Sequence, residues 1–292
     1  MRLRFLLAGF LLAALLCPVR AQVPYVSTAD DIALGGLVLK ELAAAAERED
    51  GPELMVRAAK RLLDQPYVAG TQEGRDEKLR IFLTQTDCIL FAETCLGLVK
   101  TAQRRGADAT FEDLAETLLG SRYRDGVVDR YESRLHYVSE WVAQGERNGL
   151  FRDLTGELGG VPDTRPVNYM THHSDSYAPL AGESGYAKEN RARMAAIEER
   201  VSAIPRNYIP KSKIREVEGR IRSGDILCFT TAIEGLDVSH VVIAYRAKSS
   251  DRLGFIHASI NEKKVIIDSR TLEAALSASR NITGIKVLRV QP

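Results

Sequence analysis

The sequence changes its period after Pro210, where short β-type runs follow one another: ILCF (226–229), VVIAY (241–245), GFIHA (254–258), KVIID (264–268) and IKVLRV (285–290). Turn signals separate these runs, so each run predicts a strand. The connections are short, and parallel crossovers need a dozen or more residues. The spacing therefore favours an antiparallel meander over βαβ units.

Helical spacing characterises the chain before this region. The Ala- and Leu-rich stretch 30–47 and the stretch 53–63 predict two helices. A third helix is expected after the cap-type residues Thr86 and Asp87, over an apolar run that extends to residue 102. That run is apolar almost all round, which predicts a buried helix. Helices followed by strands define an α+β fold, with N-terminal helices packed on a C-terminal antiparallel β-sheet.

The region 105–205 is mixed. It has short helical patches at 111–119, 132–143 and 190–203, and an unusually polar loop over 156–187. Long loops within compact domains commonly line a functional site. We interpret 22–292 as a single catalytic domain in which 105–205 is a helical and loop insertion that forms part of the substrate groove.

Composition excludes several classes of protein. The chain has 292 residues, of which 45% are apolar and 27% charged, so it is neither disordered nor a polytopic membrane protein. Lys plus Arg number 40 and Asp plus Glu 39, so no strong field favours nucleic acid as a partner.

The first residues form an export signal. Residues 1–21 combine basic Arg2 and Arg4, an apolar run and a small Ala21 at a plausible cleavage point, which is typical of a secretory signal peptide. A short membrane anchor is the alternative, and bulky Leu16 argues against lipidation of Cys17. The mature protein is expected to be exported, periplasmic or secreted, with no stable membrane span.

Export would leave Cys88, Cys95 and Cys228 of the four cysteines. An odd number in an oxidising compartment indicates a free thiol. Cys88 and Cys95 would lie roughly 10 Å apart along one helix, too far for a disulfide. Cys95 and Cys228 are interpreted as small core residues.

Three residues could form a nucleophilic site. Cys88 opens the buried helix, where free N–H groups favour a thiolate and could bind an oxyanion. His240 begins one predicted strand and His257 lies in the next. A symmetric hairpin centred on Lys248 and Ser249 would place the two histidines directly opposite each other, with Cβ atoms about 5 Å apart. One imidazole could then orient the other beside a thiol nucleophile.

Zinc is a competing chemistry, because one Cys and two His can ligate Zn²⁺, with His172 and His173 as further candidates. The sequence has no HExxH or CxxC spacing, so we expect neither a metal nor a cofactor.

Several segments resemble the NlpC/P60 superfamily of papain-like cell-wall hydrolases, and within it the DUF1460 amidase-like family. The segments that carry the resemblance include PYVAG (66–70), TDCILF (86–91), SRLHYVSEWV (133–142), FRDLTGELGG (151–160), VNYMTHH (167–173), SGDILCF (223–229), GLDVSHVVIA (235–244) and HASINEKKVIID (257–268). VNYMTHHSDSY departs from the family pattern at Tyr169 and after it, which concerns fine substrate preference. The resemblance implies a papain-like fold in which Cys88, His240 and His257 are catalytic.

The resemblance also implies an N-acetylmuramoyl-L-alanine amidase. Such an enzyme cleaves the amide between muramic acid and L-Ala in peptidoglycan fragments, with a preference for 1,6-anhydro sugars. The expected substrate-binding residues are Tyr67, Asp87, Arg134, His136, Asn168, Tyr169 and Ser239. For Asp87, helix capping is the alternative role. The alternatives for the protein are a D,L-endopeptidase that cuts the γ-D-Glu–diamino acid bond, a muropeptide-binding protein without turnover, and a thiol acyltransferase.

Overall fold

The computed structural model describes residues 23–74, 76–248 and 250–292. The predicted signal peptide over 1–21, including Cys17, lies outside the described residues.

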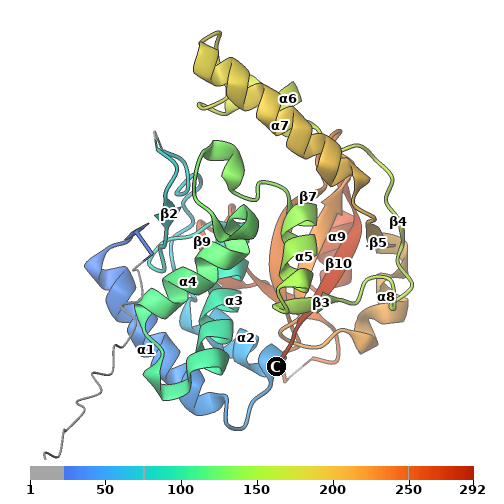
Figure 1. Cartoon of the computed structure of the whole chain (residues 1–292). Helices are drawn as coiled ribbons and strands as arrows, with labels where there is room; N and C mark the ends of the chain where they lie inside the picture. The colour runs from blue at the N-terminus through green and yellow to red at the C-terminus, as the bar shows by residue number, and fades with distance from the viewer. Residues whose placement is uncertain (1–22, 75, 249) are drawn as a thin grey trace, which may run out of the picture.

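The described residues contain nine α-helices and ten strands (Figure 1). The helices are α1 (Ala29–Ala45), α2 (Gly51–Arg61), α3 (Cys88–Arg105), α4 (Phe111–Arg122), α5 (Val138–Arg147), α6 (Tyr169–His172), α7 (Gly185–Ala203), α8 (Ile214–Val217) and α9 (Leu272–Ala278). The strands are β1 (Tyr25–Val26), β2 (Leu79–Arg80), β3 (Phe151–Asp153), β4 (Val161–Pro162), β5 (Asn207–Pro210), β6 (Ile226–Thr231), β7 (Val238–Tyr245), β8 (Gly254–Ser259), β9 (Lys264–Ile267) and β10 (Ile282–Val290). The α+β prediction, with N-terminal helices and a C-terminal antiparallel sheet, is confirmed.

The main sheet has the strand order β4-β5-β10-β6-β7-β8-β9, and β3 pairs with β10 as an eighth strand. Every pair in it is antiparallel. β6 to β9 form the predicted meander. β10 is not the next strand of this meander. The chain passes through α9 after β9, and β10 then lies between β5 and β6.

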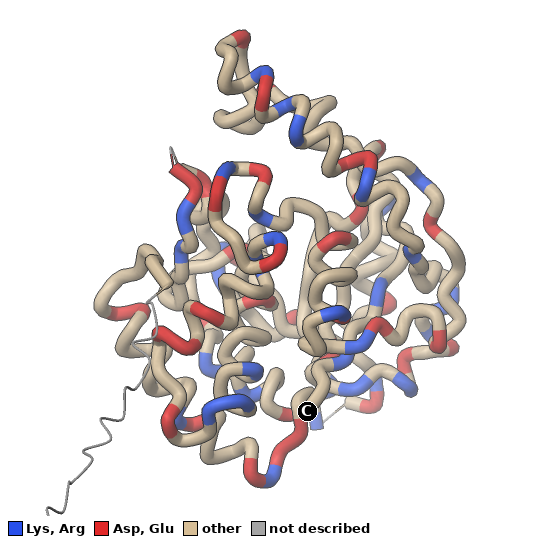
Figure 2. The backbone as a smooth tube through the Cα atoms, in the orientation of Figure 1, with Lys and Arg blue, Asp and Glu red and all other residues tan. Residues whose placement is uncertain are grey.

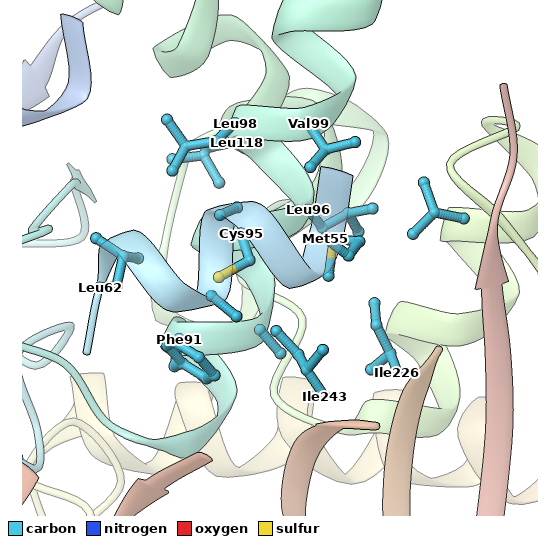
Figure 3. Packing of buried hydrophobic residues seen from close by; sticks show 14 of the residues in the cluster. Met55, Leu62, Phe91, Cys95, Leu96, Leu98, Val99, Leu118, Ile226 and Ile243 are labelled. Atoms are coloured by element: carbon cyan, nitrogen blue, oxygen red, sulfur yellow. The ribbon is translucent and has the colours of Figure 1, made fainter. Parts of the chain in front are cut away.

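Apolar side chains cover both faces of the sheet. On one face, α2 and α3 pack against the sheet, chiefly against β7, and α1 and α4 pack on α3. Figure 3 shows Phe91, Cys95, Ile226 and Ile243 in this cluster. On the other face, Leu272 and Leu276 of α9 pack with Phe229, Val242 and Phe255. Cys95 and Cys228 are fully buried and free, which confirms their interpretation as core residues.

One carboxylate connects the start of α1 to the segment that leads into α3. Asp31 Oδ2 accepts from the Thr28 N–H (3.1 Å), while Thr28 Oγ1 accepts from the Asp31 N–H, so the two residues form a capping box. Asp31 Oδ1 accepts from the N–H groups of Leu83 and Thr84, both at 2.8 Å. Because Asp31 is fully buried, this link fixes the approach to Cys88.

The middle region differs from its prediction at two places. The helix expected over 132–143 begins later, as α5, because Tyr131 and Glu132 are buried in a 3₁₀ turn and Leu135 N–H donates to Arg122 O. The short strands β3, β4 and β5 add to the sheet edge and have no clear sequence period. α6 and α7 project from the body and share a small apolar cluster with Tyr131 and Tyr137 (Figure 1).

Acidic and basic residues are interspersed along the described chain rather than segregated by sign (Figure 2). Among the described residues, no helix is both long and apolar enough to cross a bilayer.

Candidate active site

Cys88 is the first residue of α3. Asp87 precedes it in an extended conformation and its Oδ1 accepts from the N–H groups of Ile89 (3.1 Å) and Leu90 (3.0 Å). Asp87 therefore caps the helix, as one of its two predicted roles requires. The other oxygen of this carboxylate takes no part in the cap.

Burial decides the protonation state of Cys88. It raises the pKa of the thiol to about 11, and the neighbouring Asp87 charge adds to the rise. The N–H groups of Val241, Ile89 and Cys88 itself favour the thiolate but are outweighed. The sequence-based expectation of a resting thiolate is therefore wrong, because the helix terminus is weaker than desolvation here. A reaction at this sulfur needs a base.

Two imidazoles on the neighbouring strands β7 and β8 are in direct contact. Nε2 of His240 and Nδ1 of His257 share a hydrogen bond of 2.7 Å, with ring centroids 5.0 Å apart. Burial lowers the pKa of His240 to about 3 and that of His257 to about 4, so both rings are neutral at neutral pH. Since Nε2 of His240 is occupied by its partner ring, Nδ1 is the nitrogen left for a proton acceptor role.

The predicted register between these strands is wrong, although the rings meet. Ile243 pairs with Ile256 and Tyr245 with Gly254, so the hairpin is centred one residue later than a symmetric turn at Lys248 and Ser249. Leu253 is fully buried and its carbonyl accepts from the Leu272 N–H (2.7 Å), and β8 begins at the next residue. The shift moves the pairing by two residues, which keeps both histidines on one face because side chains alternate with a period of two. They meet diagonally instead of directly.

The sulfur of Cys88 faces β7 at Val241, the residue that follows His240 in the strand. The Val241 N–H stabilises the thiolate form, which places this amide at the sulfur. The ladder between β7 and β8 covers only Ile243 to Tyr245, so on this side of β7 the pairing ends before Val241 and the histidines. Tyr67 is also close to Cys88. Burial raises the pKa of Tyr67 to about 12, and the charges of the neighbouring Cys88 and Asp87 add to this rise.

A cavity of about 190 Å³ adjoins the start of α3. Asp87, Arg134 and His136 line it together with Glu73 and other residues. Arg134 is held there by Glu73 Oε1 (2.8 Å) and by Glu77 Oε1 (3.1 Å). His136 Nε2 donates to Tyr131 O (2.7 Å), and burial lowers its pKa well below the usual value, so His136 is neutral.

An ion pair that the sequence did not indicate also lines this cavity. Arg122 Nε donates to Glu93 Oε2 at 2.8 Å, and both side chains are buried. Arg122 also donates to Arg80 O (2.6 Å). Helical spacing marks position 93 as internal, and an acidic residue at an internal position is the signal that could have revealed this pair.

The other predicted binding residues lie outside this cavity. Ser239 is exposed beside His240, at a bulge of β7. The N–H groups of Asn168 and Tyr169 both donate to Gly235 O, at 3.0 and 3.1 Å. Gly235 has a φ of +74°, and a Cβ there would lie 2.3 Å from Asn168 Oδ1, so only glycine fits. Tyr169 stacks on His173 with ring centroids 4.0 Å apart.

A second groove, of about 380 Å³, lies on the side of the imidazoles that faces Phe229 and Phe255. Arg270 lines it together with both histidines. Arg270 forms an ion pair with Asp268, whose Oδ2 lies 3.3 Å from His257 Nε2. Neither residue was predicted from the sequence. In the part of the chain that the structure describes, no group of three or more His, Cys, Asp or Glu residues could hold a metal ion.

The fold is that of amidase-like α+β proteins. It matches a crystal structure of an N-acetylmuramoyl-L-alanine amidase from Bacteroides uniformis with a TM-score of 0.76 and 35% identity, covering 83% of this chain and 99% of that one. A protein from Bacteroides fragilis proposed to be a xylanase matches with a TM-score of 0.74 and 35% identity, covering 80% and 100%.

A Legionella pneumophila protein of the DUF1460 family model shares the fold, with a TM-score of 0.67 and 17% identity over 91% of this chain and 97% of that one. No curated protein matches the sequence. Residues 57–282 match the family model described as AmiA-like, N-acetylmuramoyl-L-alanine amidase-like. The chain belongs to this family, which confirms the resemblance drawn from the sequence.

Proposed function

We propose that the protein is a cysteine amidase that cleaves the amide between (anhydro)N-acetylmuramic acid and L-Ala in peptidoglycan fragments. The observation that carries the proposal is the hydrogen-bonded pair of His240 and His257 beside the strand residue whose amide faces Cys88. Family membership supplies the substrate class. On this proposal the fold is of the papain-like NlpC/P60 type.

The mechanism starts from a neutral thiol and a neutral imidazole. Sγ of Cys88 bonds to the lactyl carbonyl carbon while its proton passes to Nδ1 of His240. The Cys88 N–H at the start of α3 donates to the developing oxyanion. The bond to the L-Ala nitrogen breaks as His240 returns the proton to that nitrogen, which leaves a thioester.

Water completes the cycle. It attacks the thioester carbonyl and gives a proton to His240, and the C–S bond breaks as that proton returns to the sulfur. The products are the muramic carboxylic acid and a peptide that begins with L-Ala. His257 orients His240 throughout through the 2.7 Å hydrogen bond.

The substrate lies on both sides of the sulfur in this proposal. Tyr67 and Asp87 contact it beside Cys88, and Arg134 and His136 contact it through the adjoining cavity. Ser239 contacts the substrate next to His240. Asn168 and Tyr169 contribute from the loop that docks on Gly235, with Tyr169 presenting an aromatic face suited to a sugar.

The cellular setting is part of the same proposal. Residues 1–21 act as a signal peptide, and 22–292 form one catalytic domain in which 105–205 is an insertion beside the groove. The protein works after export, in the periplasm or outside the cell, where peptidoglycan fragments are found.

Mass analysis of defined muropeptides before and after exposure tests the function. Wild-type protein should release a free peptide beginning with L-Ala from anhydro-muropeptides, and Cys88→Ala should release none. Products that retain L-Ala-D-Glu on the sugar would instead identify a D,L-endopeptidase. Unchanged fragments that bind the protein tightly would identify a binding protein.

A further inference from the structure

A buried carboxylate lies beyond the imidazole pair. Asp268 directly follows β9, is 8% exposed, and its N–H donates to Phe255 O at 3.0 Å. Its Oδ1 accepts from the backbone N–H of Arg270 (2.8 Å) and from Arg270 Nε (3.0 Å). Its Oδ2 accepts from a terminal nitrogen of Arg270 (2.7 Å) and lies 3.3 Å from His257 Nε2.

The carboxylate is charged despite its burial. Desolvation opposes ionisation, but the hydrogen bonds and charge of Arg270 outweigh it and hold the pKa of Asp268 below its usual value. An ionised carboxylate accepts hydrogen bonds and donates none. The ring nitrogen that faces it is therefore stabilised in its protonated form.

This preference passes through both rings. His257 Nε2 has no aligned hydrogen bond to any described residue, and Asp268 Oδ2, at 3.3 Å, is the polar atom that faces it. Hydrogen bonds in active sites often tighten only in the substrate complex. A neutral imidazole carries one proton. With that proton on Nε2, Nδ1 of His257 is an acceptor, so His240 must donate from its own Nε2. Nδ1 of His240 is then bare and able to accept a proton.

We propose that Asp268 is a positioning residue that sets the tautomers of His257 and, through it, of His240, so that Nδ1 of His240 is free to take the Cys88 proton. The catalytic part of this proposal rests on the proposed function, which assigns the roles of Cys88 and His240. The tautomers of the two rings do not depend on that function. Arg270 fixes the orientation and charge of the carboxylate.

Two substitutions at position 268 separate this role from a structural one. In Asp268→Asn the amide oxygen belongs at the Oδ1 position, where two donors of Arg270 converge. The amide NH₂ then faces His257 Nε2 and forces the proton to Nδ1 of His257. His240 follows and carries its proton on Nδ1, the wrong place for a base. Asp268→Ala removes the preference without reversing it.

Asp268→Asn should therefore be the slower enzyme, although asparagine is the closer isostere. We expect kcat for Asp268→Asn at least about tenfold below that for Asp268→Ala, because a wrong tautomer blocks the general base. A purely structural carboxylate predicts the opposite order. Equal rates, or a faster asparagine variant, would overturn the proposal.

The chain supplies a matched control. Asp163 and Arg165 form the same Asp-x-Arg arrangement. Asp163 Oδ1 accepts from the Arg165 backbone N–H (3.2 Å) and from Arg165 Nε (2.8 Å). Asp163→Asn and Asp163→Ala remove an ion pair whose hydrogen bonds do not involve either imidazole. Both control variants should keep the wild-type kcat, with thermal unfolding monitored for all four variants.

Histidine ¹⁵N NMR of the full-length mature protein gives a readout independent of turnover. The wild type should show the Nε2–H tautomer on both His240 and His257, and Asp268→Asn should show Nδ1–H on both. A wild-type His257 protonated on Nδ1 would overturn the inference even if the variants fail to fold. If the wild type hydrolyses no muropeptide, the proposed function fails, and these spectra still decide whether Asp268 controls the tautomers.

Discussion

The protonation state of Cys88 gives the sharpest test of the reaction chemistry. Burial raises the pKa of this thiol to about 11, from a usual value of 9.0. Only the thiolate reacts with iodoacetamide, and the thiolate fraction changes tenfold for each pH unit below the pKa. At pH 7 the thiolate fraction of Cys88 is therefore about one hundredth of that of an ordinary cysteine.

The assay follows the alkylation of the peptide that contains Cys88 by mass spectrometry between pH 6 and 10. We expect the rate to rise about tenfold per pH unit over this whole range, with no plateau. Restricted access to a buried sulfur lowers all rates by one factor and leaves the slope unchanged. The slope is therefore the informative quantity.

A matched variant identifies the cause. Asp87→Asn removes the nearest negative charge while keeping an oxygen that can cap α3, so the same alkylation rate should be reached at a lower pH. Alkylation that is fast and constant from pH 6 to 9 would refute the reasoning, because it would show a preformed thiolate–imidazolium pair. Cys95 and Cys228 serve as internal references and should stay unalkylated, since both are fully buried.

Four further predictions concern activity and stability. Cys88→Ala should abolish muropeptide hydrolysis without lowering the unfolding temperature. In rate assays that follow the products by mass, His240→Ala should reduce kcat more than His257→Ala. Full activity of both histidine variants would contradict a catalytic role of the imidazole pair. Hydrolysis should stay level down to about pH 4 and then fall, because the depressed pKa values of about 3 and about 4 keep the imidazoles neutral above that range; a fall centred near pH 6.5 would contradict this environment. Glu93→Ala should destabilise the fold by about 3–5 kcal/mol in urea titrations because it leaves the Arg122 charge buried and unpaired, and a loss below about 1 kcal/mol would contradict it.

Sequence periods predicted the elements that carry the site, but not how they pair. The apolar run after Asp87 and the strands that contain His240 and His257 were found because each has a strong local signal. The hairpin register differs from the symmetric expectation, and Leu253 just before β8 bonds to Leu272 of α9 instead, a tertiary contact that the local pattern does not contain. The short edge strand β4 has two residues and no period to detect.

The chemistry was predictable in its residue types and not in its electrostatics. The position of Cys88 at a helix start is visible in the sequence, whereas the desolvation that reverses its expected pKa shift depends on the packed surroundings. Asp268 ends an apolar run, but only the folded hairpin places it near His257. Contacts between distant segments thus account for most of what the sequence did not indicate.

The dual role of Asp31 has a practical consequence for handling this protein. Since one carboxylate closes the first turn of α1 and also anchors Leu83 and Thr84, trimming the chain beyond Thr28 would disturb the approach to the nucleophile more than fifty positions downstream. Affinity tags and fusion partners at the amino end should therefore leave Thr28 and the residues after it intact. Limited digestion at that end would report on the integrity of the reactive centre as well as on fraying.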